Sequence, residues 1–109
     1  MSPDVEQVLT PDEIGVPLGG SATVVQISSA FCMPCRATRA VVERAVATSD
    51  GVTAVDLDVA DHLELGERLG VTSTPTVLVL DAVGRVRVRA AGVPTLAQLR
   101  AAVAAVSSA

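Results

Sequence analysis

Cys32 and Cys35 are the only cysteines in the 109-residue chain, and two residues separate them. They follow an apolar, β-branched run over 23–27 and precede a helix-like pattern that begins at Arg36. The first turn of a helix has unpaired backbone N–H groups and the positive end of the helix dipole, so a sulfur held there is stabilised as thiolate. The spacing predicts that Cys32 is the exposed, attacking thiol. Cys35, one turn deeper, is then the resolving thiol that closes a disulfide.

The CxxC motif also has two other interpretations. A zinc site needs about four ligands, and outside the motif only His62, which we expect on a helix surface, offers sulfur or imidazole nitrogen. Zinc within one chain is therefore disfavoured, although two chains could share an ion through Cys32 and Cys35. A purely structural bridge is disfavoured because so short a loop removes little entropy from the unfolded chain. Within a strand-to-helix turn of an α/β chain, the motif is typical of redox chemistry.

Size and composition limit the other functions. A chain of this length predicts one domain with its own core, and that core must be aliphatic because Phe31 is the only aromatic residue. The net charge of −4 argues against nucleic-acid binding, which needs clustered basic residues. The alternation of Arg85, Arg87 and Arg89 is typical of a solvated strand face.

The sequence also lacks the signals for export and membrane insertion. The N-terminal segment MSPDVEQVL has no apolar signal-peptide core. No run reaches the roughly 18 apolar residues of a membrane span. We expect a soluble, cytoplasmic protein without a membrane partner.

The hydrophobic pattern predicts the order β-α-β-α-β-β-α for most of the chain. Strands are expected over 23–28, 52–59, 76–80 and 85–90, and helices over 35–48, 61–69 and 95–106, the last capped by Thr95. Before these, Thr10 and Glu13 form a capping box that starts a short helix ended by Gly15, and 5–9 is a candidate edge strand.

The order of the elements predicts an α/β fold with a mixed central sheet. The first β-α-β unit implies parallel strands with a right-handed crossover, and the turn at 81–84 implies an antiparallel hairpin. We expect helices on both faces of the sheet and a short irregular N-terminal arm over 1–22.

This order, with CxxC after the first long strand and Thr-Pro before the hairpin, resembles the thioredoxin family over residues 22–106. Phe31-Cys32-Met33-Pro34-Cys35 is similar to that family's aromatic-CGPC active site. Thr74-Pro75 resembles its cis-proline segment, which faces the disulfide and pairs with substrate backbone. Gly92 resembles a glycine that lets substrate approach the same surface. The resemblance implies a thioredoxin-like fold in a single domain over 1–109, with an atypical segment at 1–22 and the core at 23–106.

Several positions depart from the family pattern. Phe31 replaces the usual tryptophan, and Met33 replaces a glycine, which puts a flexible thioether beside the nucleophile. Gln26 stands where the family has a buried acid beneath the second cysteine, and an amide cannot accept a proton as a base. Asp56 stands at the position of the family's partner lysine. Asp56 or Asp58 could act through water instead, although the alternating strand pattern favours a solvent-facing place for both.

The resemblance implies a thiol–disulfide oxidoreductase in which Cys32 attacks a disulfide of a client protein and Cys35 resolves the mixed disulfide. It implies a monomer with no bound cofactor beyond the redox-active disulfide, and a thioredoxin-reductase-like electron donor. Client contacts are expected from Phe31, Met33, Pro34, Thr74, Pro75 and Gly92, and redox tuning from Gln26. The loss of the buried acid and of tryptophan leaves an alternative open, a thioredoxin-fold binding or scaffold module with little redox turnover.

Overall fold

The computed structural model describes residues 7–108, and within this range four strands form one sheet in the order β2-β1-β3-β4. β1 is parallel to β2 and antiparallel to β3, and β3 pairs antiparallel with β4. The strands are β1 (Ala22–Ser28), β2 (Val52–Asp58), β3 (Thr76–Asp81) and β4 (Val86–Ala91).

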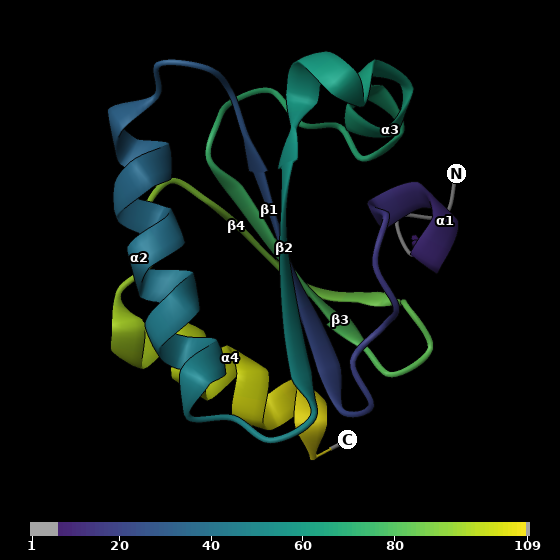
Figure 1. Cartoon of the computed structure of the whole chain (residues 1–109), viewed down its shortest axis with the longest axis vertical. Coiled ribbons are helices and arrows are strands. Elements are labelled where there is room, and N and C mark those ends of the chain that lie inside the picture. The colour runs from purple at the N-terminus through teal and green to yellow at the C-terminus, as the bar shows by residue number, and fades with distance from the viewer. Residues whose placement is uncertain (1–6, 109) are drawn as a thin grey trace, which may run out of the picture.

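Helices cover both faces of the sheet (Figure 1). The long helices α2 (Met33–Ala47) and α4 (Leu96–Ser107) lie on one face. The short helices α1 (Pro11–Ile14) and α3 (Leu63–Arg68) lie on the other. The predicted fold class is therefore confirmed. Among the residues described, no helix is long and apolar enough to cross a membrane.

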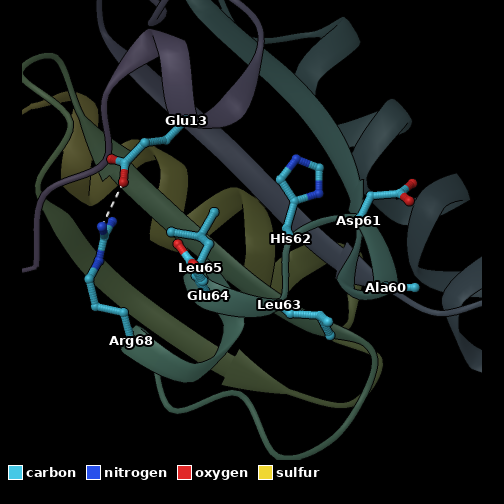
Figure 2. A pocket seen from close by; sticks show the side chains of 8 residues that line it. All are labelled: Glu13, Ala60, Asp61, His62, Leu63, Glu64, Leu65 and Arg68. Atoms are coloured by element: carbon cyan, nitrogen blue, oxygen red, sulfur yellow. Dashed lines mark ion pairs between the residues drawn. The ribbon is translucent and has the colours of Figure 1, made fainter.

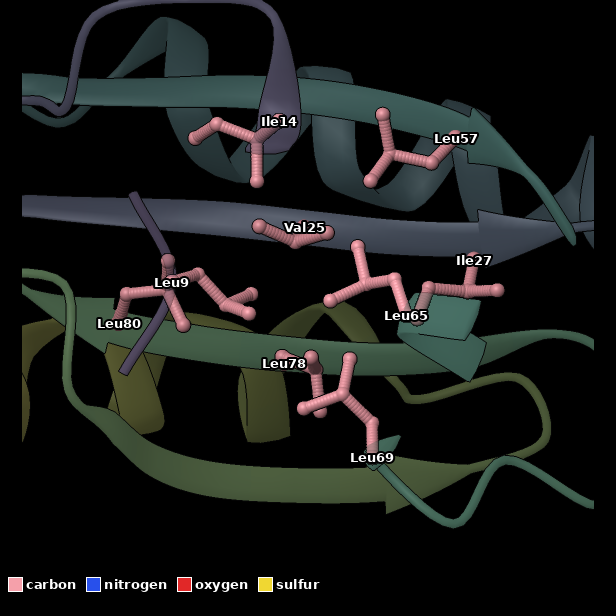
Figure 3. Close-up of a cluster of buried hydrophobic side chains, with 9 residues drawn as sticks. All are labelled: Leu9, Ile14, Val25, Ile27, Leu57, Leu65, Leu69, Leu78 and Leu80. Carbon is pink, nitrogen blue, oxygen red and sulfur yellow. The ribbon is translucent and has the colours of Figure 1, made fainter. Parts of the chain in front are cut away.

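Two aliphatic cores hold these layers together, because alternate residues of a strand point to opposite faces. The whole of β1 is buried, as expected for a central strand covered on both faces. The core beneath α1 and α3 (Figure 3) contains Leu9, Ile14, Val25, Ile27, Leu57, Leu65, Leu69, Leu78 and Leu80. The core beneath α2 and α4 contains Ala22, Val24, Val42, Ala45, Val77, Val79, Leu99, Val103 and Val106.

The predicted element bounds agree with the structure to within two residues, but three features differ. The helix predicted over 61–69 is preceded by a separate 3-10 turn, η1 (Val59–Asp61), and His62 lies between the two with a non-helical φ of −139°. Of the edge strand predicted over 5–9, residues 5 and 6 lie outside the described part, and Val8 makes a single antiparallel bridge with Arg85. The antiparallel pairing of β1 with β3 was not predicted, because the order of elements alone does not say which strand joins the central one.

The N-terminal arm is tied to the sheet and to α3. Thr10 and Glu13 form the predicted capping box at the start of α1, and Gly15 ends the helix with φ 77°. The backbone N–H of Leu9 donates to the carbonyl of Gly84 at 2.9 Å. Arg68 of α3 forms an ion pair with Glu13 at 2.6 Å. The arm therefore covers one side of the core beneath α1 and α3.

Candidate active site

Cys32 and Cys35 form a disulfide where β1 leads into α2. Cys32 is the N-cap of α2, and its sulfur accepts a hydrogen bond from the backbone N–H of Cys35 at 3.2 Å. Cys32 is half-buried, whereas Cys35 is only 1% exposed. Pro34 lies in the first helical turn, where its missing N–H has no partner to lose. This geometry gives a reactant access to Cys32 and keeps Cys35 beneath it.

A second segment reaches Cys32 from the β3 side of the sheet. The Thr74–Pro75 peptide bond is cis. The carbonyl oxygen of Thr74 lies 3.9 Å from Cys32 Sγ, and its hydroxyl lies 4.0 Å from the same sulfur. The Thr74 hydroxyl is also 2.7 Å from that of Ser29, a contact the sequence did not indicate. The carbonyl and hydroxyl of Thr74 therefore border Cys32 Sγ on the β3 side.

Gly92 closes this side of the site through the backbone. Its N–H donates to the carbonyl of Pro75 at 2.9 Å, and its φ is 83°. No atom lies within 4 Å of the place that a Cβ would occupy, so the surface above Gly92 is open. The glycine singled out in the sequence therefore lies beside the Pro75 segment, as the resemblance implies.

Exposed apolar side chains border the disulfide. Phe31 is fully exposed at 105% and Met33 is 70% exposed, and the two residues flank Cys32 in the sequence. Phe31 has φ 56°, a left-handed conformation that is rare for a bulky residue and is found preferentially at functional sites. These two side chains supply an apolar surface next to Cys32. Val93, which sequence reasoning missed, is 46% exposed and lines a separate hollow with residues of β3, β4 and α4.

Gln26 lies beneath α2 and is 1% exposed. Its side-chain amide donates to the carbonyl oxygen of Cys35 at 2.8 Å and to the hydroxyl of Ser28 at 2.9 Å. The Ser28 hydroxyl donates to Asp56 Oδ1 at 2.6 Å, and Arg39 of α2 forms an ion pair with Asp56 Oδ2 at 2.7 Å. Gln26 therefore holds the backbone of Cys35 rather than its sulfur.

This network extends the sequence prediction for Asp56. The side chain is exposed to solvent, as the alternating pattern of β2 predicted. It also forms an ion pair with Arg39 of α2. The sequence did not indicate that Asp56 would be linked through Ser28 to Gln26, because this depends on the register that places Gln26 opposite Asp56.

A charged pocket lies beside Cys32, on the β2 side of the sheet. Its volume is about 430 Å³. It is lined by Ser28, Ser29, Ala30, Phe31, Cys32, Arg36, Arg39, Asp56 and Asp58. Cys32 thus has the Thr74–Pro75 segment on one flank and a polar pocket on the other.

A larger hollow of about 650 Å³ lies between α1 and α3 (Figure 2), and neither cysteine lines it. Two of its lining side chains, Glu13 and Arg68, are paired with each other. His62, half-buried rather than fully exposed, has Nδ1 3.0 Å from the carbonyl oxygen of Asp58. In the described part of the chain, no three His, Cys, Asp or Glu side chains are grouped in a way that could hold a metal ion. The reactive sulfur therefore identifies the site better than pocket size does.

Comparison with known proteins agrees with this geometry. A family model described as a thioredoxin domain matches residues 23–104, a range that includes both cysteines and the Thr74–Pro75 segment. None of the curated protein sequences compared with the chain matches it significantly.

Similar solved structures include three thioredoxins. Chloroplastic thioredoxin z superposes with a TM-score of 0.76 at 20% identity, over 100% of this chain and 99% of the other. A thioredoxin from Malassezia sympodialis gives 0.69 at 19% identity, over 94% and 95% of the two chains. One from Fasciola hepatica gives 0.68 at 25% identity, over 81% and 83%.

Proposed function

The chain belongs to the thioredoxin-domain family, and from this membership we propose that it is a thiol–disulfide oxidoreductase that reduces disulfides in client proteins. The observation that carries the proposal is the Cys32–Cys35 disulfide at the start of α2, with one sulfur accessible and the other buried. A nucleophile and a resolving thiol need this difference in access.

In the reduced protein, the position of Cys32 favours its thiolate. The Cys35 N–H already points at Cys32 Sγ from 3.2 Å, and the N-terminal end of α2 adds a partial positive charge. The thiolate attacks a client disulfide, a mixed disulfide forms, and one client sulfur leaves as a thiolate. Cys35, after losing its proton, then attacks Cys32 Sγ. The second client sulfur leaves, and two electrons have passed from the protein to the client.

The surroundings of Cys32 suit an extended client segment. The backbone at Thr74 and Pro75 lies along one flank of the sulfur, where a client strand could pair with it. The exposed side chains of Phe31 and Met33 would cover apolar residues of the client. We further propose that Pro34 and Gly92 complete this docking surface.

The cellular setting is proposed on the same basis. A thioredoxin-reductase-like donor would return two electrons to the Cys32–Cys35 disulfide. We propose a cytoplasmic monomer, which cell fractionation and sedimentation would test. No bound cofactor is needed, because the Cys32–Cys35 pair itself carries the two electrons as a dithiol and releases them when the disulfide forms.

A second candidate function is a binding or scaffold module of the same fold with little turnover. Gln26 favours it, because both N–H groups of its amide are donated to oxygen atoms and no carboxylate lies at this position to accept a proton. The two functions differ in whether Cys32 exchanges disulfides with other proteins.

Trapping of mixed disulfides separates them. Cys35→Ser leaves Cys32 without a resolving thiol, so we expect this variant to accumulate mixed disulfides with proteins of a cell extract. Dithiothreitol should then release the trapped proteins. Cys32→Ser is the matched control and should trap none, because the remaining thiol is buried. The wild-type protein should also reduce insulin catalytically. A folded Cys35→Ser variant that traps nothing, together with a wild type that does not reduce insulin, would favour the binding module.

A further inference from the structure

Apart from Phe31 and Cys32, the residues that line the charged pocket have no part in the client surface proposed above. Thr74 and Pro75 lie on the β3 flank of the sulfur, and the pocket lies on the β2 flank. Cys32, Arg36 and Arg39 follow one another at intervals of four and three residues, so they share one face of α2. That face and the end of β2 form opposite walls of the pocket, with the attacking sulfur at its rim.

Among the charged side chains of this pocket, one positive and one negative group are available to a ligand. Arg39 and Asp56 are paired with each other at 2.7 Å. The guanidinium of Arg36 has no hydrogen bond or ion pair to any residue in 7–108. Asp58 accepts from the backbone N–H of Ala60 at 2.9 Å through Oδ1, and its other carboxylate oxygen has no partner in the described range.

We propose that this pocket binds the free α-amino-acid end of a low-molecular-weight disulfide of the cystine type. The ligand's carboxylate pairs with Arg36, its ammonium pairs with Asp58, and its sulfur lies at Cys32. The volume of about 430 Å³ is within the usual range for small-ligand sites. A cysteine inside a protein chain has peptide bonds in place of both charges. The two opposite charges therefore favour a free amino acid over a client segment. This inference rests on the proposed disulfide exchange and names a second substrate class for it.

The reaction balances without another reagent. The Cys32 thiolate attacks one ligand sulfur, the ligand S–S bond breaks, and the released thiolate takes a proton from water. Cys35 gives up its proton to water and attacks Cys32 Sγ, so the Cys32–Cys35 bond forms and the second ligand thiolate leaves. The ligand gains two electrons and becomes two thiols, while the protein dithiol is oxidised.

A set of four disulfides isolates each charge. The pre-reduced protein is mixed in turn with cystine and three derivatives. N,N′-diacetylcystine keeps only the carboxylates, and cystine dimethyl ester keeps only the ammonium groups. The doubly blocked diacetyl diamide keeps neither. Loss of protein thiols is followed by acid quenching, alkylation and mass spectrometry. Each rate is divided by the rate of the same disulfide with dithiothreitol, which removes differences in intrinsic reactivity.

We expect the normalised rate for cystine to exceed that for the doubly blocked form about 10-fold, as two exposed charge contacts of about 3-fold each would give. Arg36→Ala should lower the normalised rates of cystine and the diacetyl form relative to the doubly blocked form by about 3-fold to 5-fold. Asp58→Asn should do the same for cystine and the dimethyl ester, since asparagine keeps the cap on η1. Arg44→Ala, an exposed arginine of the same helix outside the pocket, should change no ratio.

Comparison with the doubly blocked form separates binding from reactivity. If Arg36→Ala slows all four disulfides equally, the guanidinium acts only on the Cys32 thiolate and the pocket proposal is wrong. Equal normalised rates for cystine and its blocked form in a protein that reduces insulin would overturn the pocket proposal and leave the oxidoreductase intact. A protein that reacts with none of the four and does not reduce insulin would overturn both.

Discussion

Gln26 occupies a place in the site where a side-chain donor has two acceptors and little water. Its amide nitrogen bonds the carbonyl of Cys35 and the hydroxyl of Ser28, and the side chain is 1% exposed. Arg39 and Asp56 close the network from the surface. The Gln26 amide donates to the Cys35 carbonyl and to Ser28 Oγ, and the Ser28 hydroxyl gives its own proton to Asp56. An acid at position 26 would therefore face two acceptors.

Gln26→Glu should therefore destabilise the protein, and more so at higher pH. Burial raises the pKa of the new carboxyl in the folded state. At a pH below the unfolded-state pKa, the folded and unfolded proteins both hold the proton. Above that pH only the unfolded protein releases it, so the free energy of unfolding falls. The cost is about 1.4 kcal/mol for each unit of pKa difference, added to the loss of two buried hydrogen bonds at about 1 kcal/mol each. Urea unfolding at pH 4 and pH 8 measures it.

Gln98→Glu is the matched control, because Gln98 is exposed and glutamate also fits its place in the capping box of α4. It should change the free energy of unfolding by less than about 0.5 kcal/mol. A Gln26→Glu variant whose stability relative to the wild type does not fall between pH 4 and pH 8 would contradict the buried, donor-only role assigned to Gln26.

Among the elements, α1 and α3 are short helices that depend on each other across the sheet face. The guanidinium of Arg68 holds the pKa of the Glu13 carboxyl below its ordinary value, and the Thr10 backbone N–H adds to the effect against the opposing cost of burial. Because its pKa is lowered in the folded state, the charge of Glu13 stabilises the fold at pH values above the ordinary pKa of 4.5. This contribution is lost as the pH falls below that value.

Glu13→Gln should lower the free energy of unfolding at pH 7 by about 0.5 kcal/mol, the size of a largely exposed ion pair. Glutamine retains the capping-box acceptor, so the substitution removes the charge and little else. At pH 3 the wild type and the variant should differ by less. Arg68→Gln should give a similar loss at pH 7, and the double variant should show that the two losses are not additive. Additive losses would mean that the pair contributes nothing.

One long side chain of β4 supports the segment that leads to Pro75. Arg89 donates to the carbonyl oxygen of Leu69 and to that of Gly70, the latter at 2.9 Å, so it satisfies carbonyls at the end of α3. The alternating arginines are exposed, as the sequence predicted, but Arg89 is more than part of a solvated face.

Arg89→Ala should lower the free energy of unfolding by about 1 kcal/mol and speed amide hydrogen exchange over 69–75. Arg87→Ala is the matched control, because Arg87 lies on the same strand and, within residues 7–108, makes only a 3.7 Å ion pair with Asp81. Unchanged exchange over 69–75 in the Arg89 variant would show that the end of α3 holds without it.

For the molecule as a whole, β3 contributes to both cores. Leu78 belongs to the core beneath α1 and α3, and Val79 belongs to the core beneath α2 and α4. Because one sheet joins the two cores, loss of packing on either face should weaken the entire fold. The single domain predicted over 1–109 requires the same behaviour.

Leu78→Ala should cost about 2–5 kcal/mol and Val79→Ala about 2 kcal/mol, and each variant should still unfold in one transition. Far-ultraviolet circular dichroism during urea unfolding measures both quantities. Val83→Ala, at a 62% exposed position in the β3–β4 turn, is the control and should change little. Two separate transitions in the Leu78 variant would show that the layers unfold independently.

Most features that the residues alone predicted depend on near neighbours, whereas the placement of Thr74–Pro75 beside Cys32 was implied by the family resemblance. The capping box at Thr10, the CxxC motif at a strand-to-helix junction and the antiparallel hairpin all arise from residues within a few positions of one another. Their physical causes, which are capping, dipole and turn chemistry, act locally and can be read without a structure.

The features that it did not predict join residues that are distant in the chain. Ser29 contacts Thr74 across 45 positions, and Ser28 reaches Asp56 across 28. These contacts exist because β1 pairs with β2 and β3 in one particular register, and neither the register nor the pairing of β1 with β3 follows from periodicity. The charged pocket beside Cys32 is a product of the same register.

The composition has an optical consequence at the active site. The chain has no tryptophan or tyrosine, and its one phenylalanine, Phe31, directly precedes Cys32. Near-ultraviolet circular dichroism of the protein therefore comes from that ring and from the Cys32–Cys35 bond. Reduction removes the signal of the bond, so the spectrum reports the redox state without a label. In a mixture, all tryptophan fluorescence belongs to the client, and exchange can be followed from both sides at once.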